Sequence, residues 1–339
     1  MTSALVAFVV ASTLRWLVTP RGGTGLPVEV TVPPGSDRER LAGALSAAGV
    51  VEDGVRLRAL LLVASWFVTP EPGPHLLGDD LSPVEVLRRL ARLASRGPAR
   101  LVVPEGATMF QIADRAAAEQ IATREAFLVA ARDPVLLGRL GVAEGSAEGY
   151  LFPATYPFGK DTPAARIVEV LVTESRRRLD RVLARHPGRL ARLEDELGIG
   201  ERQLVNLASM VERETGNPEE RPLVASVFLN RLRSETFRPA RMLQSDPTAA
   251  YGCLLRPELV SCVEAGGRVT PALLRDPLNP YNTYRHAGLP PGPVGNPGEA
   301  ALEAVLAAPV TDYLFFVATG GKTRFTRSLA EHEAALGGR

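Results

Sequence analysis

A strand–turn–helix pattern that occurs twice limits what this chain can fold into. In the first copy, Val28, Val30 and Val32 alternate as in a strand, and an apolar-faced helix follows and ends at Gly49. In the second copy, residues 100–122, Val-Pro-Glu-Gly stands in place of Val-Pro-Pro-Gly, and Ile-Ala stands in place of Leu-Ala. The repeat predicts a small α/β region.

The second copy, V-P-x-G followed by I-A, resembles the LysM module, which binds cell-wall glycans. The alternative is a structural α/β module without a ligand. Residues 81–95, between the two copies, predict a helix with Ser82 as N-cap, Pro83 at its first position and Glu85 completing a capping box.

The rest of the chain predicts mostly helices and loops, which makes the fold class α+β. A long Arg-rich helix is expected at residues 163–184 and an apolar helix at 201–215. A second apolar helix is expected at 217–235, with Asn217 as its cap. Loops then follow, including residues 242–252, before a short helix at 297–307 and a strand at 312–318.

Composition and missing motifs exclude several function classes. The 339 residues carry 39 Lys and Arg against 38 Asp and Glu, so the chain lacks the basic surplus of a nucleic-acid binder. His75, His186, His286 and His332 share no metal-ligand spacing, so no metal or other cofactor is expected. Nucleophile-elbow and phosphate-loop motifs are also absent. Carboxylates, amides and aromatic residues on loops remain, which is typical of a carbohydrate site.

The N-terminal segment Ala4 to Val18 is apolar apart from Ser12, Thr13 and Arg15, and it is marginal in length for a membrane span. It has no small-residue cleavage site, which favours an uncleaved anchor over a signal peptide. No Lys or Arg precedes the segment, whereas Arg15 lies near its C-terminal end and Arg21 follows it; this distribution of basic residues is the opposite of that expected if the rest of the protein lies outside the cytoplasm. A buried N-terminal helix is the alternative.

Two glutamates, Glu212 and Glu214, end the apolar helix at 201–215. They are two positions apart, so their side chains should point to nearly opposite sides. Glu214 lies in the last turn, where the helix dipole and partial burial raise a carboxyl pKa above about 4.3. This favours Glu214 as a general acid, and an exposed helix-end residue is the alternative.

Two cysteines, Cys253 and Cys262, lie close together without a nearby histidine. In a compartment outside the cytoplasm they are a disulfide candidate, and closing so short a loop stabilises by about 2.5–3 kcal/mol on the loop-entropy model. Two unpaired thiols are the alternative.

Several longer motifs together resemble the endolytic murein transglycosylase family, also called MltG or YceG-like. They are "LVVPEG", "EGYLFPATY", "LASMVERET", "VASVFLNRL", "LQSDPTAAYG", "YNTYRHAGLPPGPVGNPG" and "YLFFVA". The resemblance covers nearly the whole chain from Val28 onward. Ala154 departs from it, because many relatives have an acidic residue there.

The resemblance implies a lytic transglycosylase that cleaves the β-1,4 bond between N-acetylmuramic acid and N-acetylglucosamine in nascent peptidoglycan and leaves 1,6-anhydro ends. Glu214, the second glutamate of E-x-E-T, would be the general acid and base. Substrate-binding residues are predicted at Glu212, Gln244, Asp246, Asn282 and Tyr284. For Gln244, Asp246, Asn282 and Tyr284, fixing a loop is the alternative, and Asp246 and Asn282 in particular could form a turn. A hydrolase that uses water and a non-catalytic wall-binding scaffold are the competing functions.

The same resemblance gives the expected organisation. Residues 1–23 would form the anchor, 24–145 a LysM-like region, 146–199 a connector with the long helix, and 200–339 the catalytic domain. The expected partners are glycan strands, cell-wall synthases and the inner membrane, with the body in the periplasm.

Overall fold

The computed structural model of the protein describes residues 12–13, 15–20, 27–32, 38–51, 58, 60–61, 73–78, 80–90, 99–143, 145–160, 162–234, 236–319 and 322–337. The chain forms two compact units. Unit 1 comprises Met1–Val102, Ala113–Ala130 and Thr155–Glu174, and unit 2 comprises Val103–Ile112, Ala131–Ala154 and Ser175–Arg339. The architecture is mixed α+β, as predicted, and the sheets in the described parts are antiparallel pairs of strands.

Unit 1 contains the first two strand pairs. Strand β1 (Pro27–Val32) pairs with β2 (Gly73–Gly78), and β3 (Ala99–Val102) pairs with β4 (Thr155–Phe158). Val30 and Val32 are buried while Thr31 between them is exposed, which confirms the alternation predicted from the sequence. The helices with assigned bounds that begin in the described part of unit 1 include α2 (Arg38–Ala47), α4 (Pro83–Leu90), α6 (Arg124–Ala130) and the long α8 (Ala164–Arg185).

The start of α4 confirms the predicted capping box. The Glu85 carboxylate accepts hydrogen bonds from the backbone N–H and the hydroxyl of Ser82, and the Glu85 N–H donates to the Ser82 hydroxyl. Pro83 occupies the first helical position, where its missing N–H costs nothing.

Most of the predicted membrane anchor lies outside the described residues. Residues 12–13 and 15–18 are helical. Within the described part of the chain, every helix is too short or too polar to cross a membrane.

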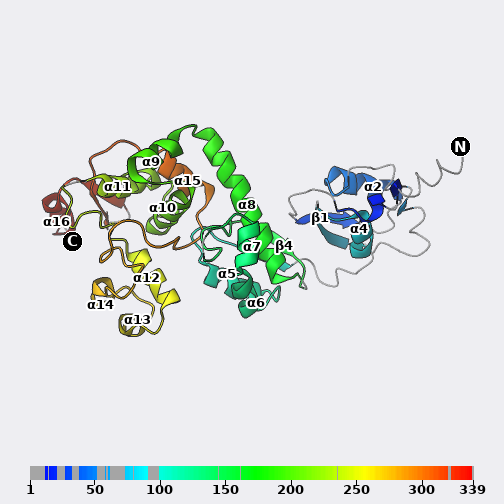
Figure 1. The fold of residues 1–339 in the computed structure, drawn as a ribbon, viewed down its shortest axis with the longest axis horizontal. Helices are drawn as coiled ribbons and strands as arrows, with labels where there is room; N and C mark the ends of the chain where they lie inside the picture. Colours follow the sequence, from blue (N-terminus) through cyan, green and yellow to red (C-terminus); the bar gives the residue numbers. More distant parts are fainter. Residues whose placement is uncertain are drawn as a thin grey trace, which may run out of the picture. The chain divides into compact units, whose positions relative to one another are not determined.

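Unit 2 is built around three packed helices, α10 (Glu201–Glu214), α11 (Arg221–Arg233) and α15 (Glu299–Leu306) (Figure 1). The apolar face of α10 is buried, including Leu204, Leu207 and Val211. The unit also contains α7 (Pro134–Arg139), α9 (Arg189–Leu197), α12 (Asp246–Leu255), α13 (Val260–Ala265), α14 (Pro271–Arg275), β5 (Phe315–Thr319), β6 (Lys322–Thr326) and α16 (Leu329–Gly337). Helix α5 (Met109–Ala118) begins in a segment of unit 2.

Two helix boundaries differ from the prediction. The second apolar helix begins at Arg221 and not at Asn217, because residues 218–220 form a turn that the Asn217 side chain closes by accepting the Glu219 N–H. The stretch expected as a loop contains α12, which begins at Asp246. Pro247 suggested a turn, but proline also fits the first turn of a helix, where no backbone N–H is needed.

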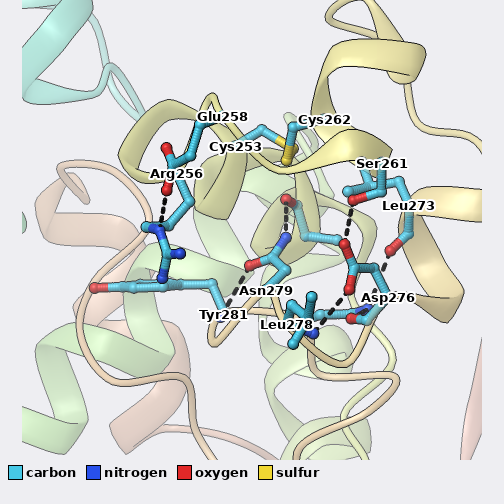
Figure 2. Close-up of a disulfide and its surroundings, with 12 residues drawn as sticks. Cys253, Arg256, Glu258, Ser261, Cys262, Leu273, Asp276, Leu278, Asn279 and Tyr281 are labelled. Atoms are coloured by element: carbon cyan, nitrogen blue, oxygen red, sulfur yellow. Dashed lines mark hydrogen bonds and ion pairs between the residues drawn. A yellow bond between two sulfur atoms is a disulfide. The ribbon is translucent and has the colours of Figure 1, made fainter.

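Helices α12, α13 and α14 enclose a small core of their own, formed by Ala249, Leu259, Cys262, Ala265 and Leu273. A disulfide joins Cys253 to Cys262 across this core (Figure 2). The Asn279 amide donates to the Ala249 carbonyl at 2.9 Å, and the Ser261 hydroxyl donates to Asp276. These contacts hold three short helices together where the apolar core alone is small.

Candidate active site

Helix α10 determines where its two glutamates lie. Gly200, in an extended conformation, precedes the helix, and Thr215, with φ −144° and ψ 133°, ends it. Glu214 is therefore the last helical residue. Glu212 is buried, whereas Glu214 is partly exposed. Their side chains have different hydrogen-bond partners, as the spacing of two positions requires.

Glu214 is the carboxyl with properties suited to proton transfer. Its Oε1 atom accepts a hydrogen bond from the Ser245 hydroxyl at 2.5 Å. Burial raises the pKa of Glu214, the charge of Asp246 acts in the same direction, and the Ser245 hydrogen bond and the charges of Arg231 and Arg213 oppose them; the resulting pKa is about 7. A carboxyl with this pKa is partly protonated near neutral pH.

Asp246 and Tyr284 form a hydrogen-bonded pair beside Glu214. The Tyr284 hydroxyl donates to Asp246 Oδ1 at 2.8 Å. Burial raises the pKa of the Tyr284 hydroxyl, and the negative charges of Asp246 and Glu214 act in the same direction. The tyrosine therefore stays a neutral donor. Of the five predicted substrate-binding residues, these two are coupled most directly to Glu214.

Arg231 in α11 is a buried cation that the sequence analysis missed. Its Nε donates to the Leu314 carbonyl at 2.7 Å, and its Nη1 donates to the Leu243 carbonyl. The guanidinium carbon lies 5.0 Å from the Phe237 ring centroid and 5.6 Å from that of Phe315. Burial lowers the pKa of Arg231 to about 10, so it stays charged at neutral pH.

A sequence signal for Arg231 existed. It continues the buried helical face of Val224, Val227 and Phe228 at the expected spacing. A charged side chain at a position on the apolar face of a helix is buried only where carbonyl oxygens, aromatic rings or an anion contact it.

Gln244 lies at an unusual backbone position. Its φ is 51°, in the left-handed region of backbone conformation that residues other than glycine rarely adopt. Its N–H donates to the Thr283 carbonyl at 3.1 Å, and the residue is partly exposed. The next residue is Ser245, whose hydroxyl donates to Glu214.

Asn282 has no polar atom directed at Glu214. Its side chain is fully buried, and its amide N–H₂ donates to the carbonyls of Leu273, Leu274 and Asp276. Its amide oxygen accepts the Tyr284 N–H at 3.1 Å. These contacts correspond to the alternative in which Asn282 fixes a turn. The bond from the Tyr284 N–H also holds the backbone of Tyr284 in position.

Glu212 belongs to a buried ion pair. Its Oε1 lies 2.5 Å from Nη2 of Arg221, and its Oε2 accepts the Gly298 N–H at 3.0 Å. Arg221 also reaches Glu105 at 3.1 Å. Both oxygens of Glu212 are thus occupied by the protein, and the structure does not bring this carboxylate together with Glu214.

Glu148 is a second buried acid that the sequence analysis missed. Its carboxylate accepts hydrogen bonds from the Met109 N–H at 2.9 Å, the Tyr251 hydroxyl at 2.9 Å and the Asn296 amide at 2.7 Å. Burial raises the pKa of Glu148 to about 7 against the opposing effect of these donors. Its partners come from distant parts of the chain, and no local pattern reveals them.

Metal-ligand geometry is not found in the described residues, where no three His, Cys, Asp or Glu side chains cluster as ligands. The groups that act on Glu214 are the Ser245 hydroxyl, the Asp246–Tyr284 pair and the guanidinium groups of Arg231 and Arg213. This set supports proton transfer and hydrogen bonding to a polar substrate.

A family model described as YceG-like matches residues 30–337. The chain belongs to the YceG-like family. This confirms the family that the sequence motifs indicated, and it covers both units of the structure.

Named relatives and a solved structure of the YceG-like family agree with this assignment. The chain is 28% identical over 329 residues to a protein named endolytic murein transglycosylase from Bacillus subtilis, covering 91% of this chain and 83% of that protein. It is 29% identical over 333 residues to a protein of the same name from Streptococcus pneumoniae, covering 90% of this chain but only 57% of that protein. A crystal structure of a YceG-like protein from Listeria monocytogenes matches with a TM-score of 0.57 and 28% identity, covering 91% of this chain and 99% of that one.

Proposed function

We propose that this protein is an endolytic murein transglycosylase in which Glu214 is the general acid and base. The observation that carries the proposal is the carboxyl at the end of α10, whose pKa is raised to about 7 and which is hydrogen-bonded by Ser245. The names of the relatives from Bacillus subtilis and Streptococcus pneumoniae support the reaction class.

The proposed reaction begins when protonated Glu214 gives its proton to the oxygen of the β-1,4 bond between N-acetylmuramic acid and N-acetylglucosamine. The bond from C1 of the muramic acid to that oxygen breaks, and the N-acetylglucosamine side leaves as an alcohol. The Glu214 carboxylate then takes the proton of the C6 hydroxyl of the same muramic acid, whose oxygen bonds to C1 and closes a 1,6-anhydro ring. One carboxyl is sufficient because the attacking group belongs to the substrate.

The surroundings of Glu214 fit both halves of this cycle. Burial keeps the carboxyl protonated at a pH where an exposed glutamate is ionised. The Ser245 hydroxyl and the buried charge of Arg231 favour the carboxylate that forms after the first proton transfer. Asp246 and Tyr284 are proposed to orient the sugar and its acetamido groups, and Gln244 is proposed to contact the glycan from the adjacent turn.

The location is part of the proposal. We propose that the apolar N-terminal segment anchors the protein in the cytoplasmic membrane and that the body lies outside the cytoplasm, where cell-wall synthases would supply nascent strands. The disulfide between Cys253 and Cys262 supports an oxidising compartment.

Digestion of purified glycan strands, followed by mass spectrometry of the new ends, tests the proposed function. We expect 1,6-anhydro ends from the wild-type protein and loss of cleavage by about 100-fold or more in Glu214→Gln, because the amide has nearly the same shape but cannot donate the required proton. Glu219→Gln is the matched control, since Glu219 is exposed and lies five positions away in the chain. Reducing ends would indicate a hydrolase, and binding without cleavage would indicate a scaffold.

A further inference from the structure

Three buried hydroxyl-bearing residues are connected to one another by hydrogen bonds, and one of them bonds to Glu214. Ser245, Thr248 and Thr283 each have a residue exposure of 1% or less. The Thr248 and Thr283 hydroxyls are 2.9 Å apart, and the Thr248 hydroxyl also donates to the Ser245 carbonyl at 2.6 Å. We call these three residues the hydroxyl cluster. Among its members, Ser245 contacts the candidate catalytic carboxyl directly.

Thr283 holds the backbone at Gln244 and Ser245 through two hydrogen bonds. The Thr283 carbonyl accepts the Gln244 N–H at 3.1 Å, and the Thr283 hydroxyl accepts the Ser245 N–H at 3.0 Å. These two bonds hold the chain where Gln244 adopts its left-handed conformation, which is unfavourable for a residue with a side chain. The strained residue directly precedes Ser245, whose hydroxyl donates to Glu214.

We propose that Ser245 is a positioning residue that assigns different roles to the two oxygens of Glu214. This inference rests on the proposed function. The Ser245 hydroxyl donates to Oε1 and occupies that oxygen, so Oε2 is the atom that exchanges the proton with the substrate. The hydroxyl cluster holds Ser245 in place. The Ser245 hydrogen bond in turn fixes the orientation of the Glu214 carboxyl group and leaves Oε2 as the oxygen that carries the proton.

The assignment has a consequence for each half of the reaction. With the proton on Oε2, the acid presents it in one direction only, toward the glycosidic oxygen. After transfer, the Ser245 hydrogen bond becomes charge-assisted and therefore stronger. Oε2 is then free to accept the proton of the C6 hydroxyl, and Glu214 returns to its starting state without changing its contact to Ser245.

The other charged and titratable groups that act on Glu214 are known from the structure. They are Arg213 on the same helix, Arg231 on α11, Asp246 at the start of α12 and Tyr284 in the loop that follows α14. Replacement of Ser245 by alanine leaves all of them in place. A change in the titration of Glu214 in that variant therefore reports the lost hydroxyl.

The experiment compares Ser245→Ala with wild type in two measurements. The first is the pKa of Glu214, from ¹³C NMR of the side-chain carboxyl in glutamate-labelled protein, assigned with Glu214→Gln. The second is the pH profile of kcat and KM for glycan cleavage. Ser209→Ala is the matched control, because Ser209 is equally buried in α10 and bonds to Asn206 and Val294 and not to Glu214.

We expect Ser245→Ala to raise the pKa of Glu214 by about one pH unit, because a hydrogen bond to a charged group is lost. The alkaline limb of the pH profile should move by the same amount. We also expect kcat to fall by about 10-fold or more with little change in KM, and Ser209→Ala should change neither pKa nor profile.

An unchanged Glu214 pKa in folded Ser245→Ala would overturn the inference, as would a fall in kcat without movement of the pH profile. If Ser245→Ala does not fold, Ser245→Cys gives the same test, since the thiol is a weaker donor of similar size. Failure of the proposed function is distinguishable, because in that case Glu214→Gln would retain cleavage whatever the NMR titration shows.

Discussion

Glu212 and Arg221 form an ion pair 2.5 Å long in which the side chains are only 3% and 7% exposed. Arg221 bonds through the same Nη2 atom to Glu105, whose side chain is 49% exposed. One cation thus has a buried and an exposed partner, which allows their contributions to be compared.

We predict that Glu212→Gln destabilises the protein by about 3–5 kcal/mol, because the buried Arg221 charge loses its compensation. Glu105→Gln is the matched control and should cost less than about 1 kcal/mol, since its carboxylate is largely solvated. Urea unfolding of both variants measures the difference. Equal losses would show that burial does not distinguish the two partners. Full stability of Glu212→Gln with a raised KM would instead support a substrate contact.

The raised pKa of Glu214 predicts a specific dependence of stability on pH. Between about pH 4.5 and 7 the folded state keeps this carboxyl protonated while the unfolded chain ionises it. The folded state then binds more protons, so its stability falls as pH rises through this window. Glu214→Gln lacks this loss and should be more stable than wild type at pH 8 by on the order of 2 kcal/mol. The difference should vanish near pH 4; a difference independent of pH would contradict the assigned pKa.

Asp246→Asn should lower the pKa of Glu214, because the negative charge of Asp246 raises it. The asparagine oxygen can still accept the Tyr284 hydroxyl, so the local geometry is retained. We expect the alkaline limb of kcat/KM to move to lower pH while the products keep their anhydro ends. Asp195→Asn, an exposed change in α9, is the control. Complete loss of cleavage in Asp246→Asn would instead suggest a hydrolase in which Asp246 activates water.

Glu148→Gln should destabilise the protein by about 1–3 kcal/mol. The Met109 N–H, the Tyr251 hydroxyl and the Asn296 amide all donate to this carboxylate, so the N–H₂ group of a glutamine at this position would face another donor. Chemical denaturation measures the loss, with the exposed Glu264→Gln as control. A neutral effect would show that Glu148 is protonated in the native protein and donates one of these bonds itself.

The pairing of Cys253 with Cys262 predicts that non-reduced native protein contains no titratable thiol. Reduction, or the double change Cys253→Ala and Cys262→Ala, should destabilise the protein by about 2–3 kcal/mol, since the closed loop restricts the unfolded chain. Thiol titration and unfolding with and without reductant measure both effects. Two free thiols in the native protein would refute the pairing.

The sequence predicted what depends on neighbouring residues. The capping box at Ser82 and Glu85 involves residues three positions apart, and the end of α10 at Glu214 follows from the Gly-Asn-Pro that comes next. Each is determined by backbone groups within one turn, so a local pattern contains the information.

The sequence could not predict what depends on distant residues. Ser245 stands between Gln244 and Asp246 in a motif that the sequence analysis quoted, but its bond to Glu214 spans 31 positions. Asn282 was predicted as a substrate contact, yet its amide is directed at three carbonyls of a neighbouring segment. Residue type alone does not reveal which way a loop amide points.

The contacts of Glu148 also bear on how the chain acquires its structure. The bonds that meet there and at Asn296 connect residues 39, 103, 148 and 189 positions apart. Contacts between such distant residues form late, since long loops must close first. During synthesis this part of the protein cannot complete its folding until residue 296 has left the ribosome, so truncated products that end before it should be substrates for quality-control proteases.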